Sequence, residues 1–443
     1  MVRNALARLD EVEPLINAFI ARDDERSMAA AAAAEHAVSE GRELGPLHGV
    51  PVSVKDLIEV EGLPCSYGSL TMKGYVPRAD APSVRRLRKA GAIVIGKTTT
   101  SEFGYRGYTK SLVHGNTRNI WDLSRTPGGS SGGAASSVAA GVTPIALGTD
   151  GGGSIRAPAS FTGLVGIKAQ FGRIPVYPLS ATPTLAHVGP IARTVSDAAV
   201  VLAVAAGPDL CDYTSLLPPI GTLSDQAAPD IRALRIAFSP TLGYGRVDAE
   251  VAKIVANAIS RLEGVLPPIE DVEEIFPDPA VILATEFIAG CSARLGDILD
   301  SQPELIDPPL LAAIRGFRTR PADDYTRILR RRYEHREVMR AFFERFDILL
   351  TPTTPVAAWP IENEGAPPGH ELALVWSYFT YPFNLSGNPA LSLPCGYTGS
   401  GLPVGLQIAA RSLDERTMVA VARRIEGALG VAGRRPPPQS APV

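Results

Sequence analysis

The 443-residue sequence has few of the side chains from which metal and redox sites are built. Its six histidines are dispersed, and no HExxH pair or other Cys/His ligand spacing occurs. The cysteines also lie far apart without a CxxC pair, and we expect buried, reduced thiols at Cys65, Cys211, Cys291 and Cys395. The sequence therefore predicts an enzyme or binding protein without a metal and without a cofactor.

Long apolar runs and a strong charge of one sign are also absent. The formal net charge is −3 with 20% charged residues, which gives no electrostatic argument for binding nucleic acid or an anionic membrane. No apolar run approaches the length needed to span a bilayer, and the first residues, MVRNALARLDEVEP, contain no signal-peptide core. We expect a globular protein of the cytoplasm with no nucleic-acid or membrane partner.

Glycine and serine, by contrast, are concentrated between residues 125 and 168. Gly128 and Gly129 precede Ser130 and Ser131, two more glycines follow, and the run 151–153 of glycine leads directly into Ser154. Glycine lets backbone N–H groups approach a ligand closely, so a glycine run that ends on a serine can form an oxyanion site around a nucleophile. This pattern indicates acyl transfer.

The motifs in this stretch occur in a characteristic order. GGSSGG is followed by GTDGGGSIRAPA and then by GLVGIK, and VPVSVKD at residues 50–56 lies upstream. With GLPVGLQ near the C-terminus, the sequence resembles the amidase signature family of serine hydrolases over roughly residues 40–428. The resemblance implies an α/β fold, the amidase signature fold, in which a central mixed β-sheet is covered by helices on both faces.

The resemblance also implies a catalytic triad. Ser154 would be the nucleophile, Ser130 the bridging serine that follows a cis peptide bond at Gly129–Ser130, and Lys55 the base. A neutral lysine can act as a base if burial lowers its pKa, and the apolar strand that leads to Lys55 predicts such burial. On the local sequence alone, an ion pair of Lys55 with Asp56 or another carboxylate remains an alternative.

The residues around the triad have expected supporting roles. The backbone amides of Gly151, Gly152 and Gly153 would form the oxyanion hole, although Gly151 stands where the family usually has a larger residue. Asp150 and Arg156 flank this loop, either as a charge-paired brace or with Arg156 binding a substrate carboxylate. The remaining supporting or substrate-binding residues are expected to be Gly128, Gly129 and Ser131.

Two motif matches point elsewhere, and both are rejected. GAIVIGKT at residues 91–98 fits the Walker A pattern, but its four middle residues form a predicted strand and leave no loop to bind phosphate. Gly128, Ser130 and Gly132 fit the G-x-S-x-G elbow of α/β-hydrolases. That elbow needs a preceding strand and a later acid and histidine, whereas turn residues precede Ser130.

We expect one domain over residues 1–430, with a mostly helical lobe at 208–346, a surface connection at 208–230 and a disordered tail at 431–443. Residues 3–40 are predicted to be helical, and residues 377–388 to contribute to the last strands. The sequence does not decide the oligomeric state, and a homodimer is one alternative.

The predicted function is hydrolysis of a small-molecule carboxylic amide to an acid and ammonia or an amine through a serine acyl-enzyme. The alternative is the A-type subunit of a glutamine-dependent tRNA amidotransferase, which shares the triad but works with a partner enzyme and tRNA. A scaffold without activity is disfavoured because Lys55, Ser130 and Ser154 are all present.

Overall fold

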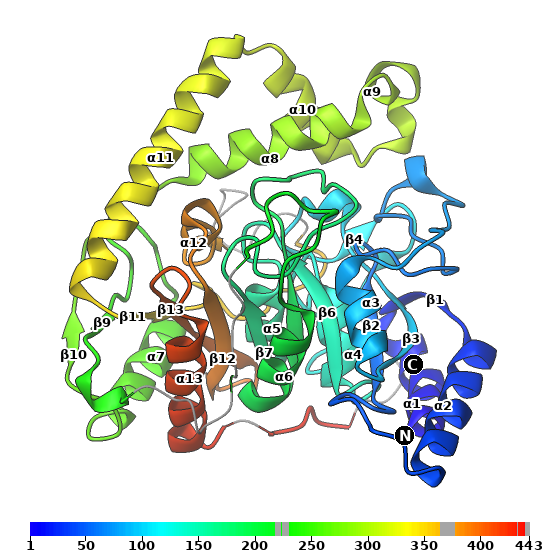
Figure 1. The fold of residues 1–443 in the computed structure, drawn as a ribbon. Coiled ribbons are helices and arrows are strands. Elements are labelled where there is room, and N and C mark those ends of the chain that lie inside the picture. Colours follow the sequence, from blue (N-terminus) through cyan, green and yellow to red (C-terminus); the bar gives the residue numbers. More distant parts are fainter. Residues whose placement is uncertain (218–222, 224–229, 364–376, 432, 439–443) are drawn as a thin grey trace.

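The computed structural model describes residues 1–217, 223, 230–363, 377–431 and 433–438. An 11-stranded sheet runs through the molecule in the order β1-β3-β2-β6-β8-β7-β12-β13-β11-β9-β10 (Figure 1). Its strands are β1 (Phe19–Arg22), β2 (Pro51–Lys55), β3 (Ile93–Thr98), β6 (Ile145–Asp150), β7 (Val165–Lys168), β8 (His187–Ala192), β9 (Ile236–Phe238), β10 (Ile269–Asp271), β11 (Ile348–Pro352), β12 (Ala390–Tyr397) and β13 (Pro403–Ala410). A small separate hairpin pairs β4 (Lys110–Ser111) with β5 (Gly115–Asn116).

The sheet is mixed. β2 pairs in parallel with both β3 and β6, and β9 pairs in parallel with β10 and β11, whereas β8, β7, β12 and β13 run antiparallel to their neighbours. Alternate residues of β11 show that both faces are covered: Ile348 and Leu350 pack into one hydrophobic cluster and Leu349 into another. The predicted fold class is confirmed.

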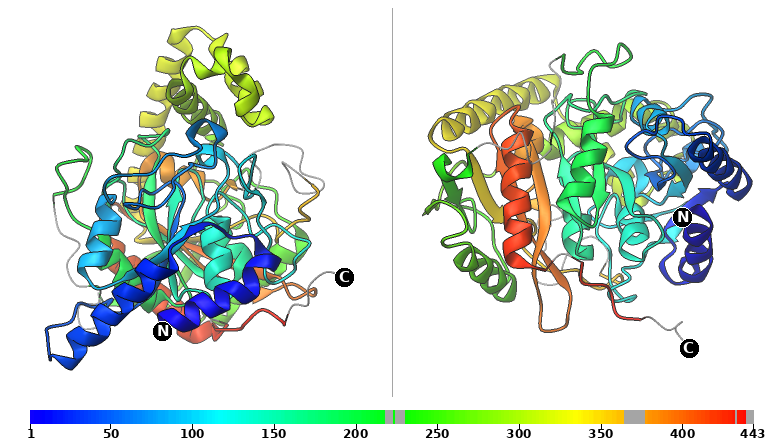
Figure 2. Two further views of the ribbon diagram at one scale, coloured as in Figure 1. Left: turned by 90° about the vertical axis from the view of Figure 1, so that its right-hand side faces the viewer. Right: turned by 60° about the horizontal axis from the view of Figure 1, so that its bottom comes forward.

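Helices cover each face of the sheet. One face packs against α3 (Pro82–Lys89), α6 (Val195–Ala205), α7 (Ala249–Arg261) and α13 (Glu415–Leu429), and α6 and α13 lie side by side there (Figure 2, right). The other face packs against α4 (Gly132–Ala139), α5 (Arg156–Thr162) and α12 (Tyr381–Ser386). The helices α1 (Val2–Ile16) and α2 (Asp24–Ser39) pack at the edge formed by β1 and β3.

Four further helices form a lobe above one end of the sheet (Figure 1). They are α8 (Ala280–Leu295), α9 (Ile298–Ser301), α10 (Pro308–Arg318) and α11 (Ala322–Arg345). The lobe is narrower than the expected range 208–346, because β9, α7 and β10 extend the sheet and its helical layer before α8 begins.

Three local expectations were wrong. Residues 3–40 are not one helical stretch, since β1 separates α1 from α2 and pairs with β3. Residues 377–388 contain α12 rather than a strand, with Pro382 in its first turn, where the missing N–H costs nothing. Cys211 is exposed, whereas Cys65, Cys291 and Cys395 are buried free thiols as expected.

Two other expectations fall partly on residues outside those described. Of the surface connection at 208–230, residues 218–222 and 224–229 are not described, and of the tail at 431–443, residues 432 and 439–443 are not. The described part of the tail includes Arg434, whose guanidinium carbon lies 4.2 Å from the centroid of the Tyr397 ring.

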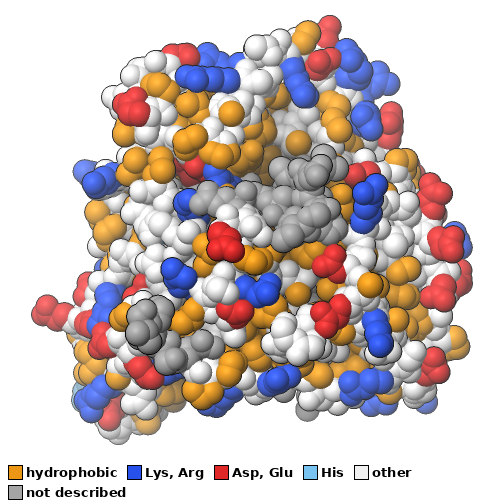
Figure 3. Space-filling view, turned by 180° about the vertical axis from the view of Figure 1, so that it is seen from behind, with side chains coloured by type: hydrophobic (Ala, Val, Ile, Leu, Met, Phe, Trp, Pro, Cys, Tyr) orange, Lys and Arg blue, Asp and Glu red, His pale blue; other side chains and the backbone are white. Residues whose placement is uncertain are grey.

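The surface carries charges of both signs. On the face drawn in Figure 3, Lys and Arg side chains are interspersed with Asp and Glu, in keeping with the small net charge. Within the described ranges, no helix has both the length and the apolar character required to cross a bilayer.

Candidate active site

Lys55 is the last residue of β2, a strand buried along its whole length. Its amine is fully buried, and Nζ lies 2.7 Å from Ser130 Oγ, 2.8 Å from Ser131 Oγ and 2.8 Å from Thr149 Oγ1. All three contacts are hydroxyl groups. Burial therefore lowers the pKa of Lys55 well below its ordinary value, although the charge of Asp150 opposes this shift.

The alternative for Lys55, an ion pair with Asp56, does not form. Asp56 instead accepts hydrogen bonds from the Ser66 hydroxyl and from two backbone N–H groups, and it pairs with Lys97 Nζ at 3.4 Å. Lys97 also donates to the backbone oxygen of Ile58 at 2.6 Å. The lysine of the Walker-like pattern is thus part of a buried structural pair, and the pattern itself lies mostly within β3.

Ser130 and Ser131 lie in the turn that enters α4. The peptide bond between Gly129 and Ser130 is cis, as the resemblance implied. Two of the surrounding glycines have no room for a side chain: a Cβ at Gly129 would lie 2.6 Å from Tyr108 backbone atoms, and one at Gly128 would lie 2.8 Å from Phe161. The strand before Ser130 in the chain, β5, ends at Asn116 and does not lead directly into this serine, so the nucleophile-elbow pattern is not realised.

Ser154 lies between β6 and α5 and lines the same cavity as Ser130. A backbone hydrogen bond joins the segments that carry these two serines, because the N–H of Ser131, the residue after Ser130, donates to the Ser154 carbonyl at 3.2 Å. Among the described residues, no hydrogen bond joins the Ser130 and Ser154 hydroxyls. The structure therefore brings Ser130 and Ser154 to one cavity, and the buried Lys55 contacts Ser130 but, among the described residues, not Ser154.

The glycine loop 151–153 requires one correction. The Gly153 N–H donates to Asp150 Oδ1 at 2.7 Å, so this amide already has an acceptor and is not a free oxyanion donor. The N–H groups of Gly151, Gly152 and Ser154 have no acceptor among the described residues. The amide of Ser154, which was not expected from the sequence, joins the group of available donors.

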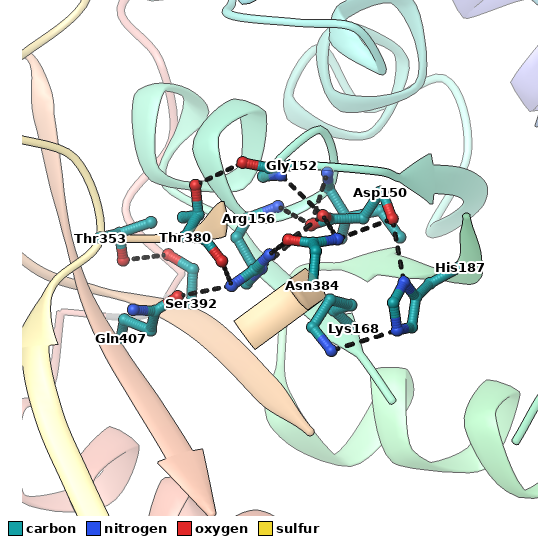
Figure 4. Close-up of polar contacts among 12 residues, drawn as sticks. Asp150, Gly152, Arg156, Lys168, His187, Thr353, Thr380, Asn384, Ser392 and Gln407 are labelled. Carbon is teal, nitrogen blue, oxygen red and sulfur yellow. Dashed lines mark hydrogen bonds and ion pairs between the residues drawn. The ribbon is translucent and has the colours of Figure 1, made fainter. Parts of the chain in front are cut away.

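Arg156 is buried and braces this loop (Figure 4). Its guanidinium donates to both carboxylate oxygens of Asp150 at 3.0 Å, to the Thr380 carbonyl at 2.8 Å, to Gln407 Oε1 at 2.8 Å and to Asn384 Oδ1 at 2.6 Å. An arginine has five N–H donors, and all five have acceptors here. The structure therefore favours the brace and leaves Arg156 no donor for a substrate carboxylate.

Asp150 is the centre of the same network. Burial alone would raise the pKa of Asp150, but the charge and hydrogen bonds of Arg156, together with a hydrogen bond from Asn384, hold this pKa below its ordinary value. Asp150 thus stays ionised and accepts hydrogen bonds from the loop it begins.

The described residues that line the cavity carry no formal charge. Within the described part of the chain, none of the residues that line it is Lys, Arg, Asp or Glu. Burial lowers the pKa of the lining residue His187 well below its ordinary value, so this imidazole is neutral. The walls come from separate segments: Leu57, Tyr67, Phe103, Pro175, Val176, Thr182, Val188 and Phe287.

Several of these residues were missed from the sequence. Thr149, which contacts Lys55, could have been identified from the sequence, since it stands beside Asp150 in the GTD motif. No sequence pattern identifies Phe287, because it is one apolar residue on α8, more than 130 positions after Ser154. Only the packing of α8 against the residue 181–182 loop, where a Cβ at Gly290 would lie 2.0 Å from the Ala181 oxygen, brings it to the cavity.

Comparison with known proteins gives consistent matches over the whole chain. The family model described as Amidase matches residues 1–419. The chain is 36% identical to an acylamidase of Rhodococcus erythropolis, covering 97% of this chain and 92% of the relative. It is also 36% identical to the A-type subunit of the glutamyl-tRNA(Gln) amidotransferase of Geobacillus kaustophilus, covering 98% and 95%. A solved bacterial aryl acylamidase superposes with a TM-score of 0.88 at 26% identity, covering 98% of this chain and 94% of that one.

Proposed function

The chain belongs to the amidase signature family and is a hydrolase that acts on amide C–N bonds, and we propose that it cleaves a small, uncharged carboxylic amide through an acyl-enzyme on Ser154. The observation that carries this proposal is the contact of a buried lysine amine with Ser130 Oγ at 2.7 Å, with no carboxylate of the described residues in contact with the amine. A buried, unpaired amine is neutral and can accept a proton.

The hydrogen bonds around Lys55 favour one direction of proton transfer. The Ser131 hydroxyl donates to the Thr149 carbonyl at 3.0 Å, so its oxygen accepts from Lys55. A neutral amine has two N–H groups and one lone pair. If the N–H groups donate to Ser131 and Thr149, the lone pair is left for the Ser130 hydroxyl proton.

The proposed reaction has two stages, acylation of Ser154 and hydrolysis of the acyl-enzyme. Ser130 passes its proton to Lys55 and accepts the Ser154 proton, while Ser154 Oγ attacks the amide carbon. The available N–H groups of Gly151, Gly152 and Ser154 stabilise the oxyanion, and loss of one such donor costs about 3 kcal/mol. The C–N bond breaks as the leaving nitrogen takes a proton back through Ser130. Water then attacks the acyl carbon and passes one proton through Ser130 to Lys55, and this proton returns through Ser130 to Ser154 Oγ as the C–O bond breaks and the acid leaves.

The uncharged cavity supports a neutral substrate. Free glutamine carries an ammonium and a carboxylate, and burying either without a partner is costly. Within the described residues, the cavity wall offers no opposite charge to them. An amide with an apolar acyl group meets no such cost, because Phe103, Val176, Val188 and Phe287 provide apolar contacts.

A second candidate function rests on the comparisons. The identity to an A-type amidotransferase subunit equals the identity to an acylamidase, at 36%. This function requires glutamine as the amide donor and a partner enzyme that uses the released ammonia.

The test is hydrolysis by the purified chain of a panel of neutral alkyl and aryl amides, carboxylated amides and glutamine, with Ser154→Ala as the control. We expect turnover of neutral amides and none by the variant. Activity on glutamine alone, and only in a complex, would favour the second function.

A further inference from the structure

The oxyanion loop is held by a helix from a distant part of the chain. In a trans peptide, the carbonyl and the N–H of one unit point in opposite directions, so a group that fixes the carbonyl also aims the next N–H. The carbonyls of Asp150, Gly152 and Gly153 each accept a hydrogen bond from outside the loop. Their donors therefore decide where the loop's N–H groups point.

Two side chains lie within hydrogen-bond distance of the Asp150 carbonyl. Asn384 Nδ2 donates to it at 3.0 Å, and His187 Nδ1 lies 3.1 Å from it (Figure 4). His187 Nδ1 also lies 2.7 Å from the Leu185 oxygen, so both neighbours are acceptors and the proton resides on Nδ1. These contacts fix the peptide that carries the Gly151 N–H.

The Gly152 carbonyl is held by Thr380, the residue that precedes α12. Thr380 Oγ1 donates to it at 2.7 Å, the shorter of its two carbonyl contacts. The N–H of the same peptide, that of Gly153, donates to Asp150 Oδ1 at 2.7 Å. This peptide is thus held at both of its polar groups.

Thr380 and Gly153 are matched in shape. Gly153 has φ +133°, and a Cβ there would lie 2.2 Å from Thr380 Oγ1. Thr380 therefore occupies space that only a glycine leaves free.

The geometry points to Thr380 and Asn384 as positioning residues of the reaction, an inference that rests on the proposed function. They anchor the two peptides on either side of the one that carries the Gly152 N–H, which has no acceptor of its own within the described chain. The amide of Ser154 is held separately, because the Gly153 carbonyl accepts from the Ala157 N–H at 2.8 Å. Helix α12 thereby aims the donors at the developing oxyanion without touching the substrate.

The test compares Thr380→Val, which keeps the shape and removes the hydroxyl, with Thr380→Ser, which keeps the hydroxyl. We expect Thr380→Val to lower kcat about 100-fold with KM nearly unchanged, because a small displacement of aligned groups is that costly. Its affinity for an alkyl boronic acid, whose adduct with Ser154 imitates the tetrahedral anion, should fall by a similar factor. Thr380→Ser should recover most of both losses.

Three outcomes would overturn the positioning role. They are an equal fall of kcat in the two Thr380 variants, a rise of KM with kcat unchanged, and an unchanged affinity for the boronic acid. If melting curves show that Thr380→Val is unfolded, Asn384→Leu replaces it as the test, because Asn384 holds the Asp150 carbonyl. A kcat of Asn384→Leu equal to that of the wild type would also contradict the positioning role. The proposed function fails separately, if wild-type protein does not hydrolyse amides or Ser154→Ala remains active.

Discussion

Lys55 Nζ lies 2.7 Å from Ser130 Oγ, and its polar contacts among the described residues are hydroxyl groups and a backbone carbonyl. Lys97, equally buried one strand away, is instead paired with Asp56 at 3.4 Å. The two lysines serve as a natural pair of matched positions, since burial is the same and only the partner differs.

Substitution of these lysines by methionine should separate activity from stability. Lys55→Met is expected to abolish amide hydrolysis, because no other base in the described part of the chain contacts the Ser130 hydroxyl. Lys97→Met leaves the buried Asp56 carboxylate without its cation, which costs about 3–5 kcal/mol of unfolding free energy. Its activity per folded molecule should be retained. Urea unfolding and initial rates measure both effects, and an inactive but fully stable Lys97→Met would contradict this assignment.

The lowered pKa of Lys55 predicts a pH dependence of stability with a definite sign. Between its folded pKa and its unfolded value near 10.4, the amine is neutral in the folded state and protonated in the unfolded state. The unfolded state then binds one more proton, so the destabilisation that this buried amine causes shrinks as pH rises, and the unfolding free energy increases by about 1.4 kcal/mol per pH unit.

The measurement is the difference in unfolding free energy between wild type and Lys55→Met across pH. It should rise with pH in that window, while kcat/KM of the wild type rises through the folded pKa of Lys55 and then levels off. A pH-independent difference would mean that Lys55 is charged in the fold.

Arg156 is expected to stabilise the loop 151–153 and not to select substrates by their charge. Arg156→Lys retains the charge but loses the planar set of five donors, so unfolding free energy should fall by about 3 kcal/mol. Because no donor of Arg156 is free, the ratio of kcat/KM between a carboxylated and a neutral amide should not change. A selective loss for the carboxylated amide would restore the substrate-binding role.

Phe287 should limit the size of the acyl group. A Cβ at Gly151 would lie 3.2 Å from Phe287 Cε2, so this ring fills the space where a side chain at 151 would stand. Phe287→Ala is expected to raise kcat/KM for long acyl groups relative to short ones by about tenfold. Gly151→Ala should lower activity, and Gly151→Ala combined with Phe287→Leu should recover part of it. Unchanged chain-length preference in Phe287→Ala would exclude this role.

Much of the site could be predicted from the sequence because its chemistry is local. The serines and glycines stand in two short motifs, and the apolar residues before Lys55 predicted a buried strand that β2 confirms. The cis peptide at Gly129–Ser130 was expected only because these motifs resemble those of the amidase signature family.

What could not be predicted depends on contacts between distant segments. The Gly153 amide looked available because nothing in the sequence indicates that Asp150 folds back to accept from it. Thr380 and Asn384 follow Asp150 by more than 200 residues and lie in a segment predicted as strand. β1 was missed because its burial does not alternate, with three partly buried residues followed by the exposed Arg22, and its pairing with β3 decides its conformation.

Covalent labelling of the nucleophile tests the central claim most directly. After reaction with a fluorophosphonate, peptide mass spectrometry should locate the label on Ser154 in the wild type and detect none in Ser154→Ala. Lys55→Met should be labelled far more slowly than Lys97→Met at the same pH, since Lys55 is the base that activates Ser154 through Ser130. A label on another residue, or equal labelling rates in the two lysine variants, would contradict the account.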